Sequence, residues 1–163
     1  MSGGTEPTIR LSIMDRLLDL SPGLGDASGS WASSVDALKR SLVRDLEWLL
    51  NTRRIAEPAP DAYPEVQHSV YHFGLPDVSS RSADSIAAQQ GLSRDIEECI
   101  RIFEPRLTDV RVVLRQSEEK GSRLARFVIE GLLRMEPNPE RVVFDTVLET
   151  PTGKFFVTGD EDA

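Results

Sequence analysis

The stretch Phe103-Glu104-Pro105-Arg106-Leu107 decides the fold, because a helical pattern of apolar residues stops here and an alternating, strand-like pattern begins. Proline lacks a backbone N–H and excludes the preceding residue from the α region, so Glu104 leaves the helix and Pro105 sets a rigid bend. An acid and a guanidinium therefore flank a fixed corner. Such a pair suits either the bracing of the protein's own helix–strand junction or the docking of another protein surface.

Helical spacing dominates the chain before this corner. Apolar residues recur along one face from residue 34 to about residue 53, and Ser33 or Ser34 is the expected N-cap. A second helical pattern covers residues 82–103, where Gly91 is a candidate break between two helices. These patterns predict long amphipathic helices with one apolar face each.

Prolines interrupt the chain between the two long helical patterns. A short helix is expected from about Pro64 to Phe73, because proline is tolerated in a first helical turn and Gly74 suits a left-handed C-terminal residue. The segment Leu75-Pro76-Asp77 then predicts a turn.

After the corner the apolar period changes to two, which is typical of half-buried strands. The predicted strands cover residues 110–115, 124–133, 141–149 and 154–158. Three sets of turn-forming residues separate them: Gly121 and Ser122, then Pro137-Asn138-Pro139, then Pro151-Thr152-Gly153, which predicts a tight hairpin. The short connections imply antiparallel neighbours. The sequence therefore predicts an α+β fold in which N-terminal helices pack on one face of a small, mostly antiparallel four-stranded sheet.

Composition limits the classes of function. The 163 residues include 27 acidic and 19 basic ones, a formal net charge of −8, which argues against nucleic acid or an anionic membrane surface as partner. No apolar run is long enough to cross a membrane, and the start of the chain lacks the features of a signal peptide. The lone Cys99 agrees with a reducing compartment. We expect a cytoplasmic protein.

The pattern also predicts the domain organisation. Residues 1–33 form a flexible N-terminal extension with a short amphipathic helix at about 11–20, which either packs on its own domain or docks in a partner groove. Residues 34–158 form the folded domain. Residues 159–163 are expected to be a solvated acidic tail.

No catalytic or metal-binding set stands out. His68 and His72 are the only histidines, and a helix would place both on one face, but no third ligand accompanies them and no zinc-protease motif is present. Nucleophile-elbow and phosphate-binding glycine motifs are also missing. We therefore expect no metal and no cofactor.

Paired carboxylates are harder to dismiss, because glycoside hydrolysis needs only two acids beside a cleft. The candidates are Glu104, Glu130, Glu136 and Asp145. In so acidic a chain a solvated or salt-bridged role is the simpler interpretation for each of them. The residues alone therefore indicate an α+β domain with a charged corner and no visible catalytic set.

Four ordered stretches resemble the TssE family, the small baseplate wedge subunits of type VI secretion systems, which are similar to the lysozyme-like wedge proteins of contractile phage tails. The stretches are residues 42–54 (LVRDLEWLLNTRR), 69–77 (SVYHFGLPD), 103–107 (FEPRL) and 127–134 (FVIEGLLR). The likeness covers about residues 10 to 158.

The resemblance implies a non-enzymatic scaffold subunit that contacts the wedge proteins TssF and TssG and connects to the sheath subunits TssB and TssC by strand exchange. It also implies that Glu104, Pro105 and Arg106 are the element that docks the wedge bundle. In that role Glu104 would accept and Arg106 would donate hydrogen bonds to a partner, with Pro105 holding the two apart. A peptidoglycan hydrolase with paired carboxylates is the alternative, and bracing of the junction is the alternative role of the corner.

Overall fold

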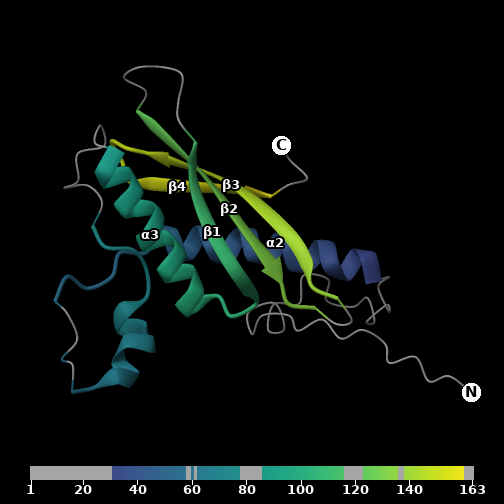
Figure 1. The fold of residues 1–163 in the computed structure, drawn as a ribbon, viewed down its shortest axis with the longest axis horizontal. Helices are drawn as coiled ribbons and strands as arrows, with labels where there is room; N and C mark the ends of the chain where they lie inside the picture. Colours follow the sequence, from purple (N-terminus) through teal and green to yellow (C-terminus); the bar gives the residue numbers. More distant parts are fainter. Residues whose placement is uncertain are drawn as a thin grey trace, which may run out of the picture.

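The computed structural model describes residues 31–57, 60, 62–77, 86–115, 123–135 and 138–159. The elements in chain order are helix α2 (Trp31–Asn51), the 3-10 helices η1 (Pro64–His68) and η2 (Val70–His72), helix α3 (Ile86–Phe103) and strands β1 (Leu107–Arg115), β2 (Leu124–Leu133), β3 (Glu140–Glu149) and β4 (Lys154–Gly159). In Figure 1, α2 passes behind the strands and α3 lies alongside β1.

The four strands form one sheet in the order β1-β2-β3-β4, and every neighbouring pair is antiparallel. Sequential strands pair because the connections between them are short. The tight turn predicted between β3 and β4 is present, with the N–H of Gly153 bonded to the carbonyl of Glu149 at 2.8 Å. The predicted α+β fold with a four-stranded antiparallel sheet is confirmed.

Both long helices differ in detail from the sequence prediction. Helix α2 begins at Trp31, so Ser33 and Ser34 lie inside the helix and the predicted N-cap is wrong. Helix α3 is continuous through Gly91, because burial of Leu92 and Ile96 against the core outweighs the cost of about 1 kcal/mol for a glycine within a helix. Its predicted start near residue 82 lies outside the described residues.

The single short helix expected at 64–73 is wrong, since two 3-10 helices stand in its place. Ser69 divides them with an extended backbone, and its side chain accepts a bond from the backbone N–H of Tyr71. Gly74 has the expected positive φ, at 100°, and an added Cβ would lie 2.2 Å from the Thr52 carbonyl oxygen. Glycine is therefore required where this segment crosses the end of α2.

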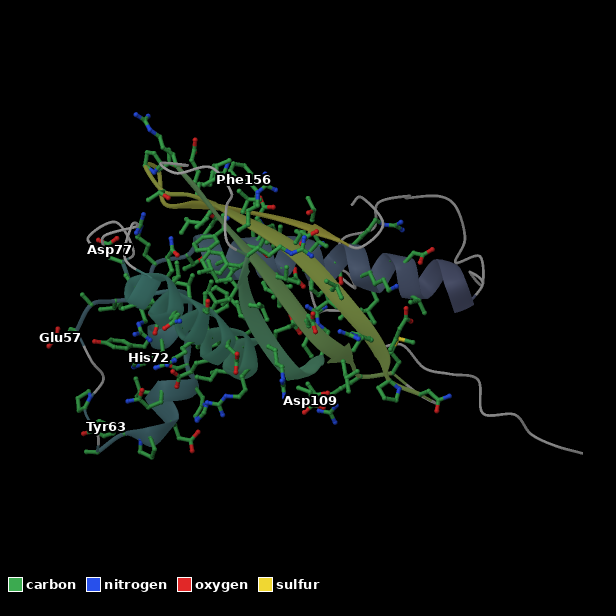
Figure 2. The ribbon with its side chains drawn as sticks, turned by 45° about the horizontal axis from the view of Figure 1, so that its top comes forward. Glu57, Tyr63, His72, Asp77, Asp109 and Phe156 are labelled. Atoms are coloured by element: carbon green, nitrogen blue, oxygen red, sulfur yellow. The ribbon has the colours of Figure 1, made fainter. Side chains whose placement is uncertain are left out.

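One apolar core lies between the helices and one face of the sheet. Its fully buried members come from both long helices, from three strands and from the segment after η2: Leu42, Leu46, Leu75, Ile96, Ile100, Phe127, Ile129, Leu133, Phe144 and Phe155. Val128, on the opposite face of β2, is not part of this cluster. The described helices do not cover Val113 and Phe156 on that second face, which are 52% and 43% exposed. Figure 2 labels Phe156.

The predicted extension with its helix at 11–20 and the tail beyond Gly159 lie outside the described part of the chain, as do the turns at Gly121-Ser122 and Pro137. Within the described residues, none of the helices combines the length and the apolar character needed to cross a membrane.

Candidate functional site

The corner after α3 forms through backbone bonds that reverse the chain at Pro105. The N–H of Glu104 still donates to the last turn of α3 at 2.8 Å, and its carbonyl accepts the N–H of Leu107 at 3.1 Å. The Arg106 carbonyl accepts the N–H of Arg134, directly after β2, at 2.8 Å. The corner is thus anchored to the helix before it and to the sheet after it.

Glu104 and Arg106 bind each other across this corner. Arg106 Nε donates to Glu104 Oε1 at 2.6 Å, and Nη2 donates to Oε2, so the pair is bidentate. The backbone N–H of Arg106 also donates to Oε1, at 3.3 Å. The expectation that Pro105 holds the two groups apart is wrong, since the bend brings them together and the double bond fixes their planes.

Helix α2 supplies the second half of this network. Asp45 Oδ2 accepts a bond from Arg106 Nη2 at 2.7 Å, and Ser41 Oγ accepts one from Nη1 at 3.3 Å. The guanidinium of Arg44 donates to the other oxygen of Asp45 at 2.8 and 3.0 Å. Neither Ser41 nor Asp45 was predicted from the sequence, although their i, i+4 spacing beside the apolar stripe placed them on one helix face.

The network keeps the Arg106 guanidinium charged. Burial alone lowers the pKa of an arginine, but the hydrogen bonds and charges of Glu104 and Asp45 outweigh this effect and raise the pKa of Arg106 above its ordinary value. Among the described residues, these bonds leave one N–H of Nη1 without an acceptor. Arg106 therefore keeps a donor for a further group.

The two charged residues of the corner differ in burial. Glu104 is 5% exposed, whereas the side chain of Arg106 is 18% exposed. The Glu104 carboxylate does not point outward, because Arg106 occupies both of its oxygens. Within the subunit the pair braces the helix–strand junction, and its role in binding a partner stays a prediction.

An exposed aromatic residue lies beside the network on α2. Trp48 is 51% exposed, and the guanidinium carbon of Arg44 lies 5.3 Å from its ring centroid, within cation–π range. Arg44 links this stack to the corner through its bonds to Asp45. We call Arg44, Asp45, Trp48 and Arg106 the corner surface. Trp and Arg are enriched among residues that dominate binding energy at protein interfaces.

Helix α2 also caps the outer edge of β4. Asn51 Nδ2 donates to the Phe155 carbonyl and Asn51 Oδ1 accepts the Phe155 N–H, both at 2.9 Å. Glu47 Oε2 accepts the N–H of Val157 at 3.4 Å. Side chains of the helix thus occupy backbone groups that an edge strand would otherwise offer to another chain.

The edge of β1 is capped less completely. Glu97 of α3 accepts the N–H of Val112 at 3.3 Å. Backbone groups alternate in direction along an antiparallel strand, so those of Leu114 face the same way, and no described residue bonds them. At the other end of this edge, a bulge between Thr108 and Arg111 interrupts the regular pairing with β2, and Asp109 within it has a φ of 52°.

The acidic residues considered for hydrolysis have different surroundings. Glu104 bonds Arg106, and Glu130 accepts a bond from Arg141 at 2.8 Å. Asp145 lies on β3 in register with Thr158 of β4, and Glu136 lies outside the described residues. Glu104 and Glu130 therefore have structural partners within the subunit.

His68 and His72 belong to different 3-10 helices but line one cavity of about 340 Å³ beside α3, where Figure 2 shows His72. Cys99 lines it too and donates its thiol to the Gly74 carbonyl at 3.4 Å. Burial raises the pKa of Cys99 to about 11. Among the residues whose positions are described, no group of three or more His, Cys, Asp or Glu side chains is arranged to hold a metal ion.

A family model described as baseplate wedge protein gp25 matches residues 36–138, which is more than half of the chain and includes most of α2, the corner, β1 and β2. The chain belongs to the gp25 family of baseplate wedge proteins. The resemblance to TssE is thereby confirmed. Membership supports a structural role in a phage or type VI secretion baseplate and contact with other baseplate components. A search of curated proteins gave no match.

Proposed function

We propose that this chain is a non-enzymatic structural subunit of a type VI secretion baseplate, which docks the TssF–TssG wedge bundle and links it to the TssB–TssC sheath. In this proposal residues 34–158 are the wedge domain, 1–33 an extension with a short helix, and 159–163 an acidic tail, and the protein works in the cytoplasm. The gp25 family match supports the baseplate role.

The hydrogen-bonded network at the corner is the observation that best supports the docking role. Glu104 is buried and Pro105 forms the exposed bend, and together they hold Arg106 against α2, which fixes the direction of its remaining donor. Trp48 supplies exposed aromatic area on the same helix. A partner would therefore meet a rigid corner surface, which lowers the entropy lost on binding.

Co-purification with TssF and TssG tests this role. Trp48→Ala should weaken capture at least about tenfold, since interface tryptophans commonly contribute more than 1.4 kcal/mol, and should leave the unfolding midpoint nearly unchanged. Tyr63→Ala, which removes a 62% exposed aromatic side chain away from the corner, is the matched control. Equal capture of both variants and the wild type would contradict docking through the corner surface.

Arg106→Lys separates docking from bracing, because it keeps a positive charge but loses the bidentate geometry. We expect this variant to lose more free energy of binding to TssF and TssG than free energy of unfolding. A loss of binding that follows the loss of folded protein would support bracing as the sole role of the corner.

For the sheath connection we propose strand addition at the Leu114 end of β1, where backbone groups lack partners in the described chain, rather than at the capped edge of β4. Main-chain bonds would supply the affinity. Leu114→Pro removes an outward N–H and should abolish co-assembly with TssB and TssC, whereas Leu114→Ala, which keeps that N–H, should retain it. Equal behaviour of the two variants would contradict this edge.

Hydrolysis of peptidoglycan is the competing function, and it has a direct assay. The purified subunit should release no soluble fragments from cell-wall preparations. Turnover that disappears when a single acidic residue, such as Asp145, is replaced by its amide would overturn the non-enzymatic assignment.

A further inference from the structure

A groove lies beside β3, next to Gly159, the last described residue of β4. The pairing of these strands ends at Phe144 and Gly159, whereas β3 already begins at Glu140. The resulting groove, of about 160 Å³, is bounded by Lys39, Arg40 and Val43 on α2, by Arg141 and Val143 on β3, and by Gly159.

Beyond the pair Phe144 and Gly159, the backbone of β3 faces this groove, and no described residue pairs with it there. The N–H of Val157 points away from β3, toward α2. Because directions alternate along an antiparallel ladder, Thr158 bonds β3 opposite Asp145, and the backbone groups of Val143 and Arg141 turn toward the groove. No described residue bonds these groups there. The groove therefore presents the backbone donors and acceptors that a further piece of β-strand would bind.

Basic side chains surround an apolar floor. Val43 and Val157 line the floor, while Lys39, Arg40 and Arg141 contribute the charges. Lys39 and Arg141 each contact one glutamate, but Arg40 is exposed and has no acidic partner among the described residues. In a chain with a net charge of −8, such a basic groove selects an acidic occupant.

We propose that the acidic segment Asp160-Glu161-Asp162 of this same chain docks in the groove and extends β4. It follows Gly159 directly, so its attachment point already lines the groove and the tether gives a high local concentration. Continuation of the β4 register sets residue 160 opposite Val143 and residue 162 opposite Arg141. Strand alternation then turns Glu161 toward the basic residues of α2.

Amide hydrogen exchange, followed by NMR, tests this docking in the full chain and in a chain ending at Gly159. The Val143 N–H should exchange at least about tenfold faster without the segment, because its strand partner is lost. The N–H groups of Val142 and Phe144 point toward β2 and should not change, so they report that the truncated chain is folded. The full-length variant Glu161→Gln with Asp162→Asn should show faster exchange at Val143 and weaker dependence on salt.

Equal exchange at Val143 in the full and truncated chains would overturn the proposal. Protection that disappears on dilution would overturn it in favour of a second copy of the chain. Protection that arises only when sheath or wedge proteins are added would overturn it in favour of a partner strand. Replacement of Arg40 by Gln should accelerate exchange, whereas Arg123→Gln, at the opposite end of the sheet, should not.

Discussion

Replacement of Arg106 by methionine leaves Glu104 buried without its ionic partner while keeping an unbranched side chain in place. Removal of one member of a buried ion pair typically costs about 3–5 kcal/mol, because the remaining charge loses its compensation. Glu104 is 5% exposed, but the side chain of Arg106 is 18% exposed, so water reaches part of the site. We therefore expect the unfolding free energy to fall by about 3 kcal/mol, the lower end of that range.

A second variant isolates the interaction. Glu104→Gln combined with Arg106→Met removes both charges, and we expect a loss of only about 1 kcal/mol, since no unpaired charge is buried. Arg141→Met is the control, because its ion pair with Glu130 is largely exposed and should contribute less than about 1 kcal/mol.

Urea unfolding followed by far-UV circular dichroism measures these differences. With a slope of about 2 kcal/mol per molar urea, Arg106→Met should shift the midpoint down by about 1.5 M. Equal shifts of the midpoint by Arg106→Met and Arg141→Met would contradict a buried, compensated charge at Glu104. A double variant less stable than Arg106→Met alone would also contradict it, because the pair would then not be coupled.

Three further variants probe other parts of the fold. Gly74→Ala should cost more than about 2 kcal/mol or prevent folding, measured by thermal unfolding, since its Cβ would lie 2.2 Å from the Thr52 carbonyl oxygen. Asn51→Ala loses both bonds to Phe155 and should lower the unfolding free energy by about 1–3 kcal/mol in urea titrations. Burial raises the pKa of Cys99 from 9.0 to about 11, so the folded state binds more protons in that interval and stability falls as pH rises through it. Between about pH 8 and pH 11, the unfolding free energy of Cys99→Ala should therefore fall by about 2–3 kcal/mol less than that of the wild type, measured by urea unfolding at both pH values.

The bounds of β2, β3 and β4 were predictable to within one residue because their signals are local, whereas β1 begins at Leu107, three residues before the predicted start. For residues 124–133 the alternation of apolar residues and the turn residues at the ends gave the bounds observed for β2. The continuity and the type of the helices were harder to predict from the sequence. Gly91 lies inside α3 because tertiary packing offsets its propensity, and Ser69 divides two 3-10 helices because its side chain competes for a backbone N–H.

The corner was predictable, but its network was not. Pro105 marks the bend in any context, since its ring and missing N–H act on neighbouring residues. Asp45 lies 61 positions before Arg106, and only the packing of α2 against the corner brings them together. The inward direction of Glu104 depends on those same contacts, because a carboxylate is buried only where a partner compensates its charge. Sequence periodicity carries no information about such a distant ionic partner.

The two bonds between Asn51 and Phe155 can form only after the chain has been synthesised through β4. The residues are 104 positions apart. Ribosomes add about 5–20 residues per second, so α2 is made roughly 5 to 20 seconds before its strand partner exists. During that interval Asn51 and Glu47 of the helix have no β4 backbone to bond. Part of the sheet that covers the apolar face of the helix is also missing. Nascent chains that end before β4 therefore lack a complete helix–sheet layer, and α2 reaches its final surroundings only after β4 has been translated.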